Sequence, residues 1–326
     1  MDFGFWIELK KPIMALAPMA DVTDTAFRRI IAKYGKPDVM FTEFVSADGL
    51  CHPDGQKRLF KDLQYSESER PIVAQLFSAR PEKMEEAGAL IQRLGFDGLD
   101  INMGCPDRNV EKQGAGAALI KNPKLAREVI RAARRGAPRL PLSVKTRLGY
   151  NKDELEMWLP ELLEEELAAV TIHARTRKEM SKVPARWEKI AKAVAIRNNL
   201  GSKTLILGNG DISDLQAARK KIRKTGADGI MLGRAIFGNP FLFLNSQEFK
   251  NGSQSDELRR RLKAMVEHAV YFKELCGHKN FAIMKKHFKA YLDGFSGAKE
   301  LRLKLMQADN ADEVEKIINE FLKLIN

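Results

Sequence analysis

"PIVAQLFSARPEKMEEAGALIQRLGFDGLDINMG", residues 71–104, contains the pattern that decides the fold. It begins with an apolar run typical of a buried strand, continues with apolar residues at helical spacing, and ends with a second apolar run. Pro81 near the start and Gly95 at the end mark the limits of the helix between the two runs. A strand, a helix and another strand in so short a span indicate a βαβ unit with parallel strands.

The same unit recurs along the chain. Eight apolar runs are each followed by a polar or glycine-containing turn and an amphipathic segment: IMALAPM from Ile13, VMFTEF from Val39, PIVAQLFS from Pro71, GLDINMG from Gly98, LPLSVKTRLG from Leu140, AAVTIHAR from Ala168, TLILGNG from Thr204 and DGIMLGR from Asp228. Other helices are also marked at both ends, with Thr23 as a candidate N-cap before Gly35, and Asn122 before Gly136. Eight units predict a closed (β/α)8 TIM barrel.

The last part of the chain has a different pattern. "NSQEFKNGSQSDE" is polar and contains Gly and Ser, and only helical patterns follow it. We therefore expect a barrel domain over residues 1–245, a linker over 246–254 and a C-terminal all-helical domain over 255–326. From residue 250 onward the chain has 15 Lys and Arg against 11 Asp and Glu. Basic clusters at Arg259–Lys263 and Lys285–Lys289 predict either RNA contacts or solvated helix faces.

Composition narrows the class of protein. The 326 residues are 44% hydrophobic and 30% charged, and no apolar run approaches the roughly 20 residues of a membrane span. The N-terminus lacks the order of a signal peptide, so we expect a cytoplasmic protein. Three widely spaced cysteines without a CxxC pair argue against a disulfide scaffold and against a metal site. The net charge of +12 favours a polyanionic partner, although a merely soluble basic protein has the same composition.

Active sites of (β/α)8 barrels lie at the C-terminal ends of the strands. Asn102, Lys145 and His173 fall there, within or at the edge of runs where an unpaired polar group is costly. Lys145 fits a Schiff-base lysine or a cation beside an anionic cofactor ring. His173 fits a base, a metal ligand or a hydrogen-bond donor, and its residue type alone does not decide between these roles.

Two glycine-rich turns follow the seventh and eighth runs, "LGNGDIS" and "LGRAIFGNP". In barrels these loops commonly bind phosphate through backbone N–H groups. We therefore expect a phosphorylated ligand.

Several motifs together resemble the tRNA-dihydrouridine synthases, and the bacterial DusB-like branch in particular. These are flavoenzymes that reduce uridine in tRNA to 5,6-dihydrouridine. The resemblance spans nearly the whole chain. It rests on "APMADVTDTAFR", "DINMGCPDRNVEKQGAGAALIKNP", "SVKTRLG", "TIHARTRKEM", "GNGDI", "GADGIMLGRAIFGNP" and "MKKHFKAYLDGFSGAKELR".

The resemblance implies FMN as cofactor and NADPH or NADH as reductant, in a monomer that needs no metal. The residues that it assigns to the cofactor are Pro18, Met19, Gln75, Lys145, His173, Asn209, Gly210, Asp211, Gly233 and Arg234. Lys145 would then be the cation that stabilises the negative charge of reduced flavin.

The resemblance also implies the chemical step. Hydride passes from reduced FMN to C6 of uracil, and the thiol of Cys105 gives a proton to C5. For this task we expect the Cys105 pKa not to be lowered far. Asn102 would bind the polar edge of uracil. The expected RNA contacts are Arg108, Arg147, Arg175, Arg177 and the basic helical tail.

Three other functions are compatible with parts of the pattern. One is an FMN-dependent barrel oxidoreductase that acts on a small molecule, as dihydroorotate dehydrogenases and ene-reductases do. Another is a non-catalytic RNA-binding protein. The third is an aldolase that forms a Schiff base at Lys145. The first of these does not explain the helical tail or the basic charge.

Overall fold

The computed structural model describes residues 3–244 and 254–324 of the chain, and its contacts divide the chain into two compact units. The first unit contains residues 1–19, 38–64 and 70–233. The second contains residues 20–37, 65–69 and 234–326. Residues 246–253 of the predicted linker lie outside the described residues, so the boundaries expected from the sequence stay a prediction.

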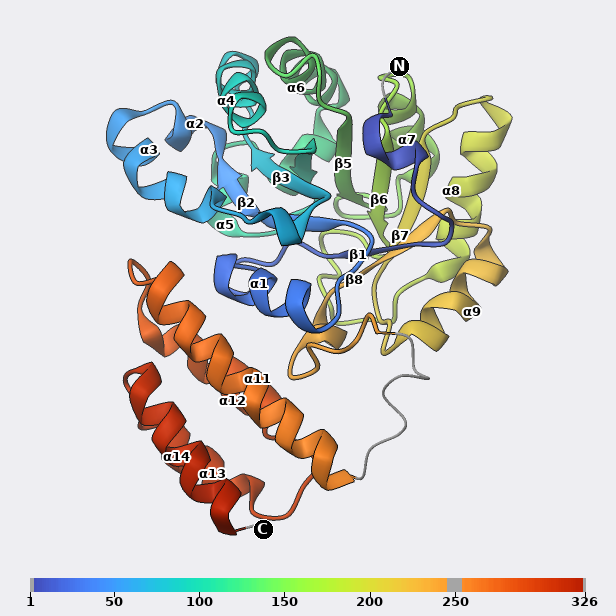
Figure 1. Ribbon diagram of the computed structural model, residues 1–326. Helices are drawn as coiled ribbons and strands as arrows, with labels where there is room; N and C mark the ends of the chain where they lie inside the picture. The colour runs from blue at the N-terminus through green and yellow to red at the C-terminus, as the bar shows by residue number, and fades with distance from the viewer. Residues whose placement is uncertain (1–2, 245–253, 325–326) are drawn as a thin grey trace. The chain divides into compact units, whose positions relative to one another are not determined.

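Eight parallel strands form the sheet of the first unit, and each overlaps one of the eight apolar runs (Figure 1). The strands are β1 (Ile13–Leu16), β2 (Met40–Ser46), β3 (Ile72–Phe77), β4 (Gly98–Met103), β5 (Leu142–Arg147), β6 (Ala169–His173), β7 (Leu205–Asn209) and β8 (Gly229–Leu232). Their order is β1-β8-β7-β6-β5-β4-β3-β2. A parallel bridge between Ala15 and Val39 joins β1 to the residue before β2. The predicted (β/α)8 TIM barrel is confirmed.

Helices of the first unit contact one another in chain order around the strands (Figure 1). The longer ones are α4 (Pro81–Arg93), α6 (Pro123–Gly136), α7 (Leu155–Leu163), α8 (Trp187–Asn199) and α9 (Leu215–Thr225). The shorter ones are η1 (Gly4–Ile7), α2 (Ala47–Leu50), α3 (Pro53–Leu59), η2 (Phe60–Leu63), α5 (Arg108–Lys112) and η4 (Gly116–Lys121). The predicted ends hold at Pro81, the first residue of α4, and at Asn122, which caps α6.

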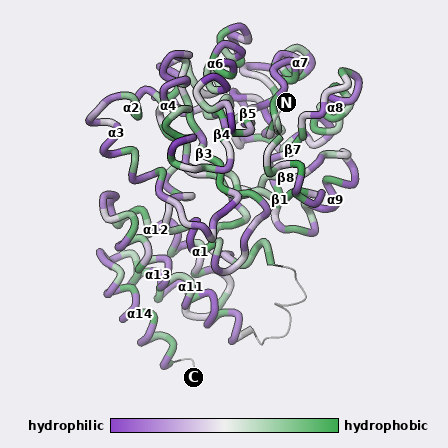
Figure 2. The backbone as a smooth tube through the Cα atoms, turned by 45° about the horizontal axis from the view of Figure 1, so that its top comes forward, coloured by the Kyte–Doolittle hydropathy of each residue, from purple (hydrophilic) through white to green (hydrophobic). Residues whose placement is uncertain are grey.

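The second unit is helical. It contains α1 (Thr25–Tyr34), η3 (Glu67–Glu69), η5 (Arg234–Ile236), α11 (Gln254–Leu275), η6 (Phe281–Ile283), α12 (Met284–Tyr291), α13 (Ala298–Leu305) and α14 (Ala311–Leu324). Hydrophilic and hydrophobic residues alternate along α11 and α14 in Figure 2, as expected for helices that bury one face. The predicted C-terminal helices are confirmed, and α1, which precedes β2 in the chain, packs against α11.

The N-cap of α1 differs by one residue from the prediction. Asp24, and not Thr23, caps the helix, because its carboxylate accepts a hydrogen bond from the N–H of Phe27 at 2.9 Å. The carbonyl oxygen of Thr23 instead accepts from the guanidinium of Arg28 at 2.7 Å. Gly35 follows the last residue of α1, as expected.

Candidate active site

Strand register brings the polar residues at the carboxyl ends of β3 to β7 into neighbouring positions. Because residues two apart on a strand point to the same side, these side chains belong to one face of the sheet. The paired positions are Gln75 with Asp100, Asp100 with Ser143, Asn102 with Lys145, Arg147 with His173, and His173 with Asn209. Six of the expected cofactor and substrate residues, Gln75, Asn102, Lys145, Arg147, His173 and Asn209, thus meet at one end of the barrel.

Cys105 lies on the loop after β4, and hydrogen bonds on both sides fix its backbone. Its N–H donates to Oδ1 of Asn102 at 2.9 Å, and its carbonyl oxygen accepts from the N–H of Ala117 at 3.0 Å. Gly116 has a φ of +61°, and a Cβ there would lie 2.8 Å from the carbonyl oxygen of Cys105. A glycine is therefore required where the chain returns to the cysteine.

The thiol of Cys105 is half-buried. Burial raises its pKa above the ordinary value, and this effect outweighs the opposing influence of Lys145 and Arg147. The expectation that the pKa is not lowered far is confirmed. At neutral pH the group is a thiol, which can donate a proton, and not a thiolate.

Lys145 is a cation without a carboxylate partner in the part of the chain that the structure describes. Its side chain is only partly exposed, and burial together with the nearby Arg147 lowers its pKa to about 8. Asp100 acts in the opposite direction, but it makes no ion pair with Lys145. A largely desolvated ammonium group without a counter-ion is well suited to an anionic ligand.

Arg175 joins two of the residues expected to hold the cofactor. It is 2% exposed, and its guanidinium contacts Nε2 of His173 at 3.0 Å and forms an ion pair with Asp211. Since a guanidinium can only donate, Nε2 of His173 accepts, and a neutral ring carries its proton on Nδ1. Arg175, which we expected to contact RNA, therefore lies among the cofactor residues.

Gly210 is the tightest point of the loop after β7. Its φ is +123°, and a Cβ there would lie 3.1 Å from Cδ2 of His173 and 2.9 Å from Cβ of Ala185. Its carbonyl oxygen accepts a hydrogen bond from the indole N–H of Trp187 at 3.0 Å. Because Gly210 has no side chain, a ligand can approach the backbone at this turn closely. A phosphate-binding loop requires such an approach to its N–H groups.

The remaining expected cofactor residues lie at the ends of β1, β7 and β8. A Cβ at Gly233 would be 3.6 Å from Sδ of Met19, and Pro18 is buried beside Met19. The amide of Asn209 donates to the carbonyl oxygen of Met231 at 2.7 Å, so it ties β7 to β8. Arg234 is the first residue of η5, in the helical unit.

The other arginines expected to contact RNA differ in exposure. Arg108 is exposed at the first residue of α5. Arg147 is 7% exposed and donates to three backbone carbonyls, among them that of Gly104 at 2.7 Å. Arg177 forms a two-pronged ion pair with Glu111 and lies 5.2 Å from the ring centroid of Tyr150. Arg147 and Arg177 therefore hold loops of the barrel mouth together.

Sequence reasoning did not single out Asp100, Ser143 and Tyr150. Asp100 is 1% exposed, and Ser143 donates to its carboxylate at 2.5 Å. A usable signal was present, since Asp100 is a charged residue in the middle of the apolar run GLDINMG, two positions before Asn102 and hence on the same side of the strand.

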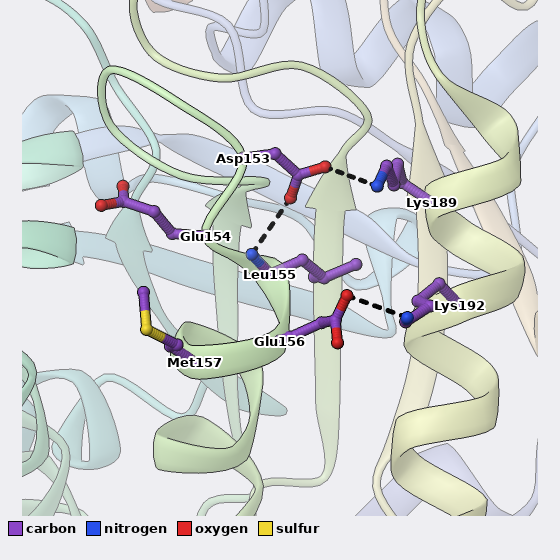
Figure 3. A pocket seen from close by; sticks show the side chains of 7 residues that line it. All are labelled: Asp153, Glu154, Leu155, Glu156, Met157, Lys189 and Lys192. Carbon is purple, nitrogen blue, oxygen red and sulfur yellow. Dashed lines mark hydrogen bonds and ion pairs between the residues drawn. The ribbon is translucent and has the colours of Figure 1, made fainter.

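A cavity of about 250 Å³ lies elsewhere, between the start of α7 and α8 (Figure 3). The residues that line it are Asp153, Glu154, Leu155, Glu156, Met157, Lys189 and Lys192. Its charges pair with one another, Lys189 with Asp153 at 2.9 Å and Lys192 with Glu156 at 2.8 Å. These ion pairs connect two outer helices, and the cavity contains none of the residues expected in the active site.

The structure describes residues 3–244 and 254–324 of the chain. In these ranges, no group of three or more His, Cys, Asp or Glu residues could hold a metal ion. No helix there combines the length and the apolar composition needed to cross a bilayer.

Comparison with solved structures shows the fold. An old yellow enzyme homologue from Zymomonas mobilis aligns with a TM-score of 0.51 at 13% identity, over 74% of this chain and 89% of that one. Morphinone reductase in complex with tetrahydroNAD aligns with a TM-score of 0.50 at 14% identity, over 70% and 84% of the two chains.

Comparison with protein families gives a closer relationship. "Probable tRNA-dihydrouridine synthase 2" of Bacillus subtilis (strain 168) is 44% identical over 98% of this chain and 97% of its own length. "Probable tRNA-dihydrouridine synthase" of Staphylococcus aureus (strain COL) is 41% identical over 98% and 96%. The family model described as dihydrouridine synthase (Dus) matches residues 15–326, which include every residue of the barrel mouth described above. The chain belongs to the dihydrouridine synthase family.

Proposed function

We propose that this protein is a tRNA-dihydrouridine synthase that reduces the C5–C6 double bond of uridine in tRNA. The observation that carries the proposal is that one end of the barrel holds both a half-buried thiol, Cys105, and an ammonium group, Lys145, that has no carboxylate partner among the described residues. The first is a proton donor, and the second suits a cofactor that becomes anionic on reduction. Family membership and the names of the two relatives support the same reaction.

The residues of the barrel mouth fit FMN. The bare backbone at Gly210 suits its phosphate, with Asn209 and Asp211 next to it in the sequence. Gly233 and Arg234, which follow β8, are further proposed contacts of the phosphate. Lys145, His173, Gln75, Pro18 and Met19 are the proposed contacts of the ring and ribityl chain. When bound, FMN supplies the hydride that reaches C6 of uracil, and NADPH or NADH restores it.

The protein supplies position and a proton. Cys105 gives the proton to C5, so that one hydride and one proton together saturate the C5–C6 bond. The target base must leave its stack in the folded RNA, which costs a few kcal/mol that contacts to the RNA backbone offset. Arg108 is exposed and is our proposed contact of this kind. Direct contact of RNA with Arg147, Arg175 or Arg177 stays a prediction, and the bonds they form support a role in holding the loops.

Unmodified tRNA transcript, incubated with the purified protein and NADPH, tests the proposal. We expect dihydrouridine to appear by mass spectrometry of the digested RNA. Cys105→Ala is expected to lower turnover about 10²-fold or more while FMN binding persists, because general acids contribute factors of that size. Cys51→Ala is the matched control, since this half-buried thiol caps the end of α2, donates to the carbonyl oxygen of Lys83 and is not among the residues expected in the active site.

Other results would point to other functions. If dihydrouridine stays undetectable while the protein reduces small enones or oxidises dihydroorotate, the protein is a small-molecule oxidoreductase of the same fold. A purified protein that takes up no flavin would contradict both enzymes, and equal activity of Cys105→Ala would remove Cys105 from the mechanism.

A further inference from the structure

A chain of hydrogen bonds runs beneath the barrel mouth from β5 to the Cys105 loop. Ser143 Oγ donates to Oδ1 of Asp100 at 2.5 Å, and Gln75 Nε2 donates to Oδ2 of the same carboxylate at 2.6 Å. Nδ2 of Asn102 donates to Oε1 of Gln75 at 3.1 Å. Oδ1 of Asn102 then accepts from the N–H groups of Gly104 at 3.1 Å and Cys105 at 2.9 Å. The chain connects three strands to the backbone of the proposed proton donor.

The direction of every hydrogen bond follows from the groups at the two ends of this chain of hydrogen bonds, the Asp100 carboxylate and the N–H groups of the loop. A carboxylate can only accept, so Gln75 must turn its NH₂ group toward Asp100 and its carbonyl toward Asn102. Asn102 must in turn direct its NH₂ group at Gln75 and its carbonyl at the loop. If the Asn102 amide were reversed, its NH₂ group would face the N–H of Cys105, donor against donor, and the loop would lose its anchor. If the Gln75 amide were reversed, its carbonyl would face the carboxylate of Asp100 and its NH₂ group would face that of Asn102.

Burial makes these orientations costly to change. Gln75 is 0% exposed, Asp100 1% and Asn102 5%, so water does not readily replace a lost partner. Burial raises the pKa of Asp100 to about 6, while the bonds from Ser143 and Gln75 and the charge of Lys145 favour the ionised form.

We propose that Asp100 is a positioning residue, which through Gln75 sets the orientation of the Asn102 amide and so holds the Cys105 loop in place. The role of the loop in proton transfer rests on the proposed function. The positioning of the loop itself does not depend on it.

The same chain limits how Asn102 can recognise a base. Its Oδ1 already accepts two hydrogen bonds, and one of its two Nδ2 hydrogens is used by Gln75. What Asn102 can still offer is one N–H donor. It therefore matches a carbonyl oxygen on the edge of uracil and not the N3–H group.

Asp100→Leu tests the proposal, because leucine has a similar size and accepts no hydrogen bond. Released from its anchor, the loop should expose the thiol, so we expect iodoacetamide to alkylate Cys105 at pH 8 about tenfold faster than in the unchanged protein. Turnover on tRNA should fall by about 10- to 100-fold through kcat, as expected when a reacting group is misplaced by about 1 Å. Cys51 reports the general opening of the fold and should react at its original rate.

Two further variants keep the test decisive. Asp100→Asn should restore both quantities to within about threefold, because its Oδ1 can face Gln75 while its NH₂ group donates to Ser143. If Asp100→Leu fails to fold, Asp100→Ser replaces it, since serine is too short to reach Gln75 and leaves space for water. Its expected alkylation rate and turnover are those of the leucine variant.

Ile101→Ala is the matched structural control. Ile101 is 0% exposed on the same strand and points to the opposite face, so this change destabilises the barrel without touching the chain of bonds. Equal alkylation rates of Cys105 in Asp100→Leu and Ile101→Ala would overturn the positioning role. Because alkylation needs no RNA, an unchanged protein that fails to reduce tRNA would reject the proposed function and leave this test intact.

Discussion

The barrel and the helical unit each bury a cluster of polar side chains, and the two clusters differ in their partners. In the barrel, Asp100, Gln75 and Asn102 bond to one another and to the loop that carries Cys105. In the helical unit, His268 and His287 are both 0% exposed, and their ring nitrogens have no hydrogen-bond partner among the described residues. A cluster with partners fixes orientation, whereas a cluster without partners can only stay uncharged.

The histidine cluster is held by aromatic packing. The rings of His268 and His287 lie 4.7 Å apart at 75°, and both lie within 5.5 Å of the ring of Phe27. Phe237 stacks on His287 at 5.7 Å. These ring contacts involve the carbon atoms of the imidazoles and give the nitrogens no hydrogen-bond partner among the described residues. Protonation of either ring is therefore strongly disfavoured.

The largest expected effect is the loss of folding stability at acidic pH that the histidine cluster causes. Burial lowers the pKa of His268 from 6.5 to about 3, and burial with the charges of His268 and Lys286 lowers the pKa of His287 well below 6.5. Below pH 6.5 the unfolded chain therefore binds two protons that the folded chain does not. The free energy of unfolding should fall by about 2.7 kcal/mol for each pH unit below that value and stay level above pH 7.5.

Urea denaturation followed by circular dichroism between pH 7.5 and 4.5 measures this slope. His287→Phe, which fills the same space without nitrogens, should lose about half of it. His278→Phe is the control, since His278 is exposed in the turn after α11, and its slope should match the original. A His287→Phe protein with the full slope would show that other groups cause the acid sensitivity.

Breaking the buried ion pair of the helical unit should lower the free energy of unfolding by a slightly smaller amount. Arg28 and Glu69 are both 0% exposed, and Nε of Arg28 lies 2.7 Å from a carboxylate oxygen of Glu69. Like the polar residues of the barrel cluster, and unlike the two histidines, each side chain therefore has a buried polar partner. Arg28→Met leaves the carboxylate of Glu69 with the partly exposed Arg29 at 3.4 Å. We expect a loss of about 3 kcal/mol in the free energy of unfolding, because Arg29 compensates the buried carboxylate only in part once Arg28 is gone.

The double variant Arg28→Met with Glu69→Gln tests the cause, because it removes both charges. It should recover part of the loss in the same denaturation experiment. If it is no more stable than Arg28→Met alone, the cost arises from packing around the arginine and not from the loss of its charge beside Glu69.

Deprotonation of Lys145 in the barrel should lower the affinity for the cofactor by about one order of magnitude per pH unit. Its pKa of about 8 means that the ammonium loses its proton as the pH rises through 8, and with it the attraction for an anionic cofactor. The affinity for reduced FMN, whose ring is anionic, should fall by up to about tenfold per pH unit above pH 8. Anaerobic titrations that follow the absorbance of reduced FMN measure this. Lys145→Met should bind weakly with no such slope, and the exposed Lys152→Met should behave as the original.

Both clusters also show what the sequence could and could not predict. The eight strands followed from apolar runs, and Asn102, Lys145 and His173 from their places at strand ends, because both depend on local pattern. Cys105 was singled out by the family resemblance. The partners of Asp100 could not be predicted, since they depend on register between strands 25 and 43 residues away in the chain. Arg175 and Arg177 looked available for RNA for the same reason, as their carboxylate partners, Asp211 and Glu111, lie 36 and 66 residues away.

The helical unit was harder to interpret for a related reason. His287 stands in the basic segment MKKHFKAY, where charge alone indicates a solvated or RNA-facing surface. Helical periodicity separates its residues, since Met284, His287, Phe288 and Tyr291 are buried, while Lys289 is exposed. That α1 shares the core of this unit depends on tertiary packing, which no local pattern records.

The smallest expected effect concerns the outer face of α12, and it tests whether the histidines and lysines of one helix have separate tasks. Lys285 and Lys289 are four residues apart and so share a side of the helix, and Lys285 forms an ion pair with Asp309 at 3.4 Å. If this face contacts tRNA, Lys289→Gln should lower the slope of log Kd against log salt by about 0.7–0.9, the value for one lost phosphate contact. Filter binding at several salt concentrations measures this slope.

The control is Lys124→Gln, which changes an exposed lysine on α6 of the barrel unit and should leave the slope unchanged. Equal changes in both variants would mean that the basic charge acts diffusely, and that α12 contributes its buried histidine face to stability without a specific RNA contact on the other.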